Sequence, residues 1–308
     1  MSEILIEKGP DFFCSLESRS IAEDLVGSAP RADYWFMLEY DGKWGKKAFA
    51  ESSIFGELTD FRQKIDALER SRLLLVKQDG PQHEGGSFFV ALSKNNDPEM
   101  FQFPFSDYAE LNDLDIADIV SSPEKYQKFK VDDPIYFVCT NGLRDKCCAR
   151  NGVPVYQELS EVLGQQVWQS THHGGHRFSA NMLKMPQALS FGQLDMGKTN
   201  EILGEIAKGL IPARHFRGRT TLSQVEQAAE TLTMNAMENW SELAYRVDSI
   251  AQDDGNEWVA QVNDQTTDAN MEVRINRLEQ DNMMYVSCVG EKQAPQVKYE
   301  LISIAPAT

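Results

Sequence analysis

Pro134-Ile-Tyr-Phe-Val-Cys139 is a short apolar run between turn residues, which predicts a buried strand that ends on a cysteine. A helical pattern follows at 153–163, where Pro154 suits the first turn and Gly164 suits the end. A second candidate strand covers 166–170. The strand–helix–strand order predicts an α/β layer. Because open α/β sheets hold their sites beyond the carboxyl ends of strands, the segments that follow these two strands should lie close together.

These two segments carry most of the metal-binding side chains of the chain. The first, Cys139-Thr-Asn-Gly-Leu-Arg-Asp-Lys-Cys147-Cys148, holds three of the five cysteines. The second, His172-His173-Gly174-Gly175-His176, holds three of the five histidines. Thiolate and imidazole are the side chains that hold zinc and iron best. The paired glycines let the backbone turn tightly, so that His172 and His176 can point at one atom while His173 points away.

The cysteine spacing leaves three kinds of chemistry open. Neighbouring residues rarely bind one ion together, so we expect one ligand from the pair Cys147–Cys148. Thiol–disulfide exchange at either of these two cysteines is one alternative, although the chain has no Cys-x-x-Cys. A structural zinc site with two cysteines and two histidines is another, although the spacing is not that of a zinc finger. An iron–sulfur cluster with the same ligand set is the third.

The rest of the chain indicates two further units around this one. We expect an α/β domain at 1–130, a second α/β domain with the Cys/His site at 131–220, and a tail at 221–308. The first domain shows candidate strands at 34–40, 73–77 and 87–92, with a helical pattern at 53–68. The second continues with a short helix at 178–185 closed by Pro186, a strand at 188–192 and a helix at 198–208. The tail pattern indicates a helix at 221–247 and a small antiparallel sheet within 257–303.

Composition and charge exclude several classes of protein. The 308 residues carry 47 acidic and 30 basic side chains, a net charge of −17, so nucleic acid should repel the chain. Hydrophobic residues make up 42%, which is enough to bury a core, yet no apolar run is long enough to span a membrane. The start lacks the apolar segment of a signal peptide, and the odd cysteine count fits a reducing compartment. We therefore expect a cytoplasmic protein.

The region around the Cys/His segments differs in charge from the rest. Residues 139–186 hold five basic and three acidic side chains, a local net charge of +2. Arg144, Arg177 and Lys184 are therefore candidates to stabilise an anionic centre. Thr171 is a candidate to donate a hydrogen bond to that centre, or else to cap a helix. The two remaining cysteines, Cys14 and Cys288, are expected to be small buried apolar side chains.

In combination, the Gly-x-Arg-Asp of the first segment and the His-x-Gly-Gly-His of the second resemble the sucrase/ferredoxin-like family, a group of thioredoxin-like ferredoxins. An N-terminal stretch with Cys14, Gly27 and Trp44 is similar to the same family, so the resemblance runs from about residue 12 to about residue 230. It implies that 131–220 is a thioredoxin-like ferredoxin domain. The strand–helix–strand order of 1–130 permits a degenerate second domain of that kind.

The resemblance also implies a [2Fe–2S] cluster with two cysteine and two histidine ligands. Matched motif to motif, these are Cys139, Cys148, His172 and His176; Cys148 is preferred to Cys147 because the family's second cysteine stands nine positions after the first. The implied function is one-electron transfer between redox partner proteins rather than catalysis. Glycoside hydrolysis needs two placed carboxylates, and the sequence singles out no such pair.

Overall fold

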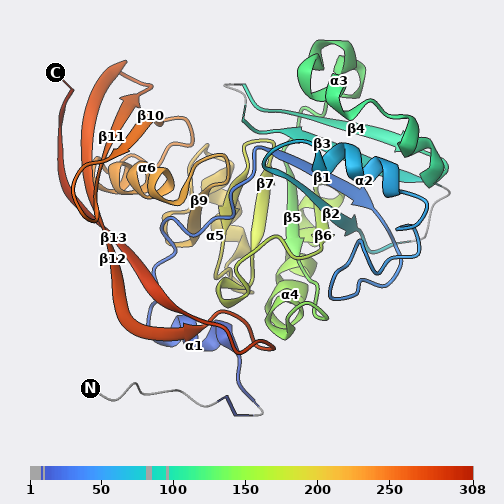
Figure 1. Cartoon of the computed structure of the whole chain (residues 1–308), viewed down its shortest axis with the longest axis horizontal. Helices are drawn as coiled ribbons and strands as arrows, with labels where there is room; N and C mark the ends of the chain where they lie inside the picture. The colour runs from blue at the N-terminus through green and yellow to red at the C-terminus, as the bar shows by residue number, and fades with distance from the viewer. Residues whose placement is uncertain (1–7, 10, 81–84, 95–96, 308) are drawn as a thin grey trace.

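The computed structural model describes residues 8–9, 11–80, 85–94 and 97–307, and Figure 1 shows their arrangement. Residues 1–7, on which the expectation about a signal peptide depends, lie outside this part. Within the described residues, nine strands form one mixed sheet in the order β4-β3-β1-β2-β6-β5-β7-β8-β9. Four further strands form an antiparallel sheet in the order β10-β11-β12-β13. The fold is therefore mixed α/β, with the β-rich tail that the sequence predicts.

In the N-terminal half of the large sheet, the buried strand β1 lies between β2 and β3. The elements of this half are β1 (Tyr34–Glu39), α2 (Thr59–Asp66), β2 (Ser71–Lys77), β3 (Gly86–Leu92), β4 (Glu99–Phe105) and α3 (Ile116–Ser121). Strand β1 pairs in parallel with β2 and antiparallel with β3, which pairs antiparallel with β4. Phe61 and Ile65 on α2 pack on this sheet in one apolar cluster with Phe36 and Phe88. Burial of these apolar side chains is the main stabilising term of this half.

The C-terminal half of the large sheet repeats the same connections. Its elements are β5 (Ile135–Cys139), α4 (Lys146–Leu163), β6 (Val167–Ser170), β7 (Met182–Met185), β8 (Leu189–Phe191), α5 (Thr199–Ile206) and β9 (Phe216–Arg219). Strand β5 pairs in parallel with β6 and antiparallel with β7, which pairs antiparallel with β8. The two halves join where β2 and β6 pair antiparallel, at Val76–Ser170 and Lys77–Gln169. Each half thus has the order strand, helix, parallel strand, and then two antiparallel strands.

The C-terminal sheet extends into a long hairpin. Helix α6 (Gln224–Ala236) begins at a capping box between Ser223 and Glu226 and precedes β10 (Tyr245–Gln252), β11 (Glu257–Asp264), β12 (Ala269–Tyr285) and β13 (Gln293–Pro306). In Figure 1 the β12–β13 hairpin runs away from its own sheet and passes α1 (Cys14–Ser20) on the way to the start of α4. The tail therefore reaches back to the region of the predicted site.

Short 3₁₀ helices connect several of these elements. They are η1 (Tyr108–Asp113), η2 (Pro123–Phe129), η3 (Gly164–Gln166), η4 (His176–Phe178) and η5 (Ala213–His215). Among the described helices, none combines the length and the apolar character that crossing a membrane requires.

Four local predictions were wrong. The helix expected at 53–68 covers only Thr59–Asp66, and turns precede it. Helix α4 begins at Lys146 instead of 153, because the Asp145 side chain accepts a hydrogen bond from the backbone N–H of Cys147 (3.0 Å) and caps the helix directly after the cysteine loop. The helix expected at 178–185 does not form; Met182–Met185 is instead the strand β7, whose four buried residues pair with β5. The helix expected to end at 247 ends at Ala236, before β10 begins.

Helix α4 can approach the end of β5 closely because residue 152 is glycine. A Cβ at Gly152 would lie 2.0 Å from the Cys139 carbonyl oxygen. We expect Gly152→Ala to lower the free energy of unfolding by about 1–3 kcal/mol, the usual cost of overpacking. Urea unfolding measures this change. As a control, Gly204→Ala in α5 places its methyl where no atom lies within 4 Å and should stabilise the protein slightly. Equal stability of Gly152→Ala and the wild type would contradict the close approach.

Candidate metal centre

The four predicted ligand residues lie at the ends of two neighbouring strands and at the starts of two helices. Cys139 is the last residue of β5, and Cys148 lies in the first turn of α4. His172 follows the end of β6, and His176 begins η4. Both cysteines are fully buried, whereas both histidines are partly exposed. The site thus has buried sulfur atoms at its base and imidazole rings nearer to solvent.

The donor atoms of these residues lie within a few ångströms of one another. The Nδ1 atom of His172 lies 3.8 Å from Cys139 Sγ and 3.7 Å from Cys148 Sγ. The Nδ1 atom of His176 lies 3.6 Å from Cys148 Sγ. The two imidazole rings stack with their centroids 3.7 Å apart. The structure therefore brings all four residues together, and Cys139, Cys148 and His172 are close enough to hold one metal ion.

The histidine loop depends on its glycines and on a buried arginine. Gly174 and Gly175 have positive φ angles of 118° and 77°, and a Cβ at Gly175 would lie 2.4 Å from the Arg217 guanidinium. Arg217 is fully buried and donates hydrogen bonds to the Gly174 carbonyl (3.1 Å) and to Asn181 Oδ1 (2.9 Å). Asn181 in turn donates to the Gly175 carbonyl (2.8 Å). The sequence does not predict the role of Arg217, because the residues around it give no sign that it contacts the glycine turn at 174–175.

The protonation states suit metal binding. Burial lowers the pKa of His172 and of His176, and nearby positive charge, including that of Arg144, lowers both further. Both rings are therefore neutral at physiological pH, which is the form that binds a metal. A hydrogen bond from the Cys148 thiol lowers the pKa of Cys139, and the same hydrogen bond raises that of Cys148. Cys139 is thus the more acidic of the two thiols.

The four residues predicted to surround the centre have different surroundings. Lys184 lies in β7 and pairs with the buried Glu242 carboxylate. Arg144 lies in the loop between β5 and α4, and its charge acts on both histidines. Arg177 pairs with the buried Glu23 carboxylate (2.7 Å) and lies over the Phe178 ring. Thr171 caps no helix: its hydroxyl accepts a hydrogen bond from the Leu75 N–H (3.0 Å), at the joint between the two halves of the sheet.

Cys147 points away from the histidines, toward the other two cysteines. Its sulfur contacts Cys14 Sγ (3.7 Å) and Cys288 Sγ (3.2 Å). Cys14 is fully buried, as expected, whereas Cys288 is only partly buried, and both lie against the Cys147 sulfur instead of packing only as apolar side chains. The two cysteines lie 133 and 141 residues from Cys147 along the chain, so no local pattern predicts this cluster.

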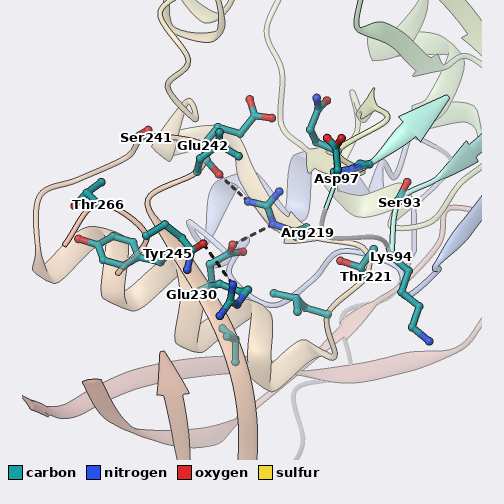
Figure 2. A pocket seen from close by; sticks show the side chains of 17 residues that line it. Ser93, Lys94, Asp97, Arg219, Thr221, Glu230, Ser241, Glu242, Tyr245 and Thr266 are labelled. Carbon is teal, nitrogen blue, oxygen red and sulfur yellow. Dashed lines mark hydrogen bonds and ion pairs between the residues drawn. The ribbon is translucent and has the colours of Figure 1, made fainter. Parts of the chain in front are cut away.

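A separate cleft of about 830 Å³ lies beside α6 and the first strand of the C-terminal sheet (Figure 2). Arg219 in this cleft pairs with Glu230 (3.1 Å) and donates to the Glu242 carbonyl (3.0 Å). None of the described residues that line it is a cysteine or a histidine. The cleft and the Cys/His site are therefore different places on the molecule.

Comparison with known proteins identifies the family. A family model described as sucrase/ferredoxin-like matches residues 25–218. The chain belongs to the sucrase/ferredoxin-like family. The match covers both halves of the large sheet with all four candidate ligands, and it ends within β9. Helix α6, the C-terminal sheet and its hairpin thus lie outside the region that matches the family. No curated protein and no solved structure matches the chain.

His173 lies between the two candidate ligands in the sequence, but its ring is fully buried. Burial, with the charges of Arg217 and Arg72 nearby, lowers its pKa from 6.5 to about 3. The unfolded chain therefore binds a proton near pH 6 that the folded chain rejects, and stability falls as the pH falls. This one group should remove about 2 kcal/mol of unfolding free energy between about pH 7 and pH 5.

Urea unfolding of the wild type and of His173→Gln at these two pH values tests this expectation. The pH dependence should be shallower in the variant, because glutamine does not titrate. Any pH dependence that comes from metal release is common to both proteins and cancels in the comparison. Parallel pH profiles for the two proteins would show that His173 does not contribute.

Proposed function

We propose that this protein transfers single electrons through a [2Fe–2S] cluster held by Cys139, Cys148, His172 and His176. The observation that carries this proposal is the convergence of two thiols and two Nδ1 atoms, with sulfur–nitrogen distances of 3.6–3.8 Å. Membership of the sucrase/ferredoxin-like family supports it. The repeated strand order supports a thioredoxin-like ferredoxin domain at 131–220, preceded by a degenerate domain of the same kind at 1–130 and followed by the tail at 221–308.

The donor set fits such a cluster. Two cysteines and two histidines hold the [2Fe–2S] centre of Rieske proteins. In this chain both rings turn the same nitrogen, Nδ1, toward the sulfur atoms, and both rings are neutral. A two-iron core between the sulfurs and the nitrogens needs more room than 3.6–3.8 Å provides. The Gly174–Gly175 pair is the part of the histidine loop whose backbone can change to provide that room.

The second candidate is a structural zinc site with the same ligands. Tetrahedral zinc with ordinary bond lengths places sulfur and nitrogen about 3.6 Å apart. The observed distances are close to this value, which is the specific observation in favour of zinc. Thiol–disulfide exchange has less support, because Cys147 and Cys148 are both fully buried and an attacking thiolate needs access.

The residues around this centre would have different roles in electron transfer. When bound, the cluster supplies one-electron chemistry at a potential above that of an all-cysteine plant-type centre. The partly exposed His172 and His176 rings provide the route between the buried sulfurs and a docked redox partner. Arg144 and Arg177 supply positive charge around the site, and Thr171 fixes the start of the histidine loop. All five cysteines are free, which supports the cytoplasm as the proposed compartment.

Metal analysis of protein from iron-replete cells, with an electron paramagnetic resonance spectrum of the reduced form, tests the proposal. We expect a reddish-brown protein with two irons per chain and the signal of a reduced [2Fe–2S] centre. Cys148→Ser should lose the iron, because its sulfur faces both histidines. The matched control Cys147→Ser changes the adjacent residue, whose sulfur faces away, and should keep it. A colourless wild-type protein that contains zinc and loses one zinc ion on Cys148→Ser would establish the second candidate instead.

A ligand exchange tests the role of the histidines separately. His172→Cys replaces a neutral ligand with a charged one, so we expect a shifted visible spectrum and a lower midpoint potential. His176→Ala removes a ligand and should reduce or abolish the visible absorption. Spectroscopy and a redox titration measure both effects. Unchanged spectra in both variants would refute the ligand assignment.

A further inference from the structure

Three cysteines that take no part in the Cys/His site form a cluster of their own. The sulfur of Cys147 lies 3.7 Å from that of Cys14 and 3.2 Å from that of Cys288, and the sulfurs of Cys288 and Cys14 are 3.5 Å apart. Cys14 and Cys147 are fully buried, and Cys288 is partly buried. Each sulfur therefore contacts both of the others. A disulfide would join only two of the three.

A carboxylate completes this cluster. The ligand atoms of Cys14, Cys147, Cys288 and Asp145 all lie within 4.8 Å of one another. Asp145 is fully buried and accepts hydrogen bonds from the N–H of Cys147 at Oδ1, and from Ser287 Oγ and the N–H of Cys288 at Oδ2. A carboxylate has about four lone-pair positions, so one position on Oδ1 remains for a further partner.

We propose that Cys14, Cys147, Cys288 and Asp145 form a second metal centre, which binds a thiophilic closed-shell ion of the zinc class. Three thiolates and one carboxylate make a four-coordinate set, as structural zinc sites require. With zinc–sulfur bonds of ordinary length, the sulfurs of such a site are about 3.8 Å apart. The three observed separations of 3.2–3.7 Å lie just below this value, so the ligands need to move little.

The charge of the cluster also favours a cation. A buried carboxylate beside thiolates is costly unless positive charge compensates it. Within the part of the chain that the structure describes, no basic side chain forms an ion pair with Asp145. The nearby Lys146 and Arg150 instead lie over the Phe13 ring, at 4.3 and 4.2 Å from its centroid. A bound divalent ion would supply the missing charge.

The second centre would fasten three distant segments together. Cys14 begins α1, Cys147 lies in the first turn of α4, and Cys288 lies at the tip of the β12–β13 hairpin. Phe12 packs edge-on against Tyr285 at the same place, with ring centroids 5.3 Å apart. The hairpin lies outside the family match, so this centre uses a ligand that the tail alone contributes. It would hold the start of α4, where the next residue, Cys148, faces the Cys/His site.

Metal analysis of the full-length protein, purified with a phosphine reductant, tests this second centre. We expect one zinc per chain in addition to the iron. Cys288→Ser should lose that zinc. Changing a residue that only supports a ligand weakens metal binding roughly 10- to 100-fold, and removing a ligand itself weakens it more. Cys288 lies in a hairpin turn and is partly exposed, so the variant should fold and keep the iron chromophore. Cys14→Ser, from a different segment, should lose the same zinc.

Cys139→Ser is the matched control, because it should lose the iron and keep the zinc. The result also separates this inference from the proposed function. If zinc fills both sites, the wild type contains two zinc ions and Cys288→Ser contains one. Zinc content that is equal in the wild type and in both variants would overturn the second centre. A disulfide between Cys147 and Cys288 in zinc-free wild-type protein, seen by mass spectrometry, would overturn it as well.

Discussion

The first turn of α4 constrains everything around the Cys/His site. Successive residues of an α-helix point about 100° apart, so Cys147 and Cys148 face different directions although they are neighbours. The Asp145 cap fixes where the helix starts and therefore fixes both directions. Cys148 then faces the histidines, and Cys147 faces α1 and the hairpin tip. A helix that began one residue later would exchange or misdirect these sulfurs.

The histidine side of the site depends on contacts from both halves of the large sheet. Pairing of β2 with β6 ends at Ser170, and the Thr171 hydroxyl extends this joint by one more hydrogen bond. From the other direction, the buried Arg217 on β9 holds the Gly174–Gly175 turn, and it also bonds to Ser28 Oγ (3.1 Å) near the N-terminus. The positions of His172 and His176 thus depend on contacts from both halves of the large sheet. A buried arginine of this kind stabilises only because its donors are satisfied, since an unpaired buried charge would be costly.

The sequence predicts the parts of this arrangement that depend on local order. The apolar run at 134–139 and the strand at 166–170 place Cys139 and the histidine loop at strand ends, and the structure agrees. The start of α4 was missed because Pro154 and the helical pattern after it concealed the earlier cap at Asp145. The contacts of Cys14 and Cys288 depend on how far the β12–β13 hairpin extends, which tertiary packing decides and residue spacing does not show.

Electrostatics connects the two groups of ligands. The chain is strongly acidic, and both groups place sulfur atoms, which must become thiolates to bind a metal, beside the buried Asp145. The start of α4 offsets part of this cost, because the positive end of the helix dipole lies next to Cys147 and Cys148. The carboxylate acts in the opposite direction on His176, where its charge raises the pKa that burial lowers.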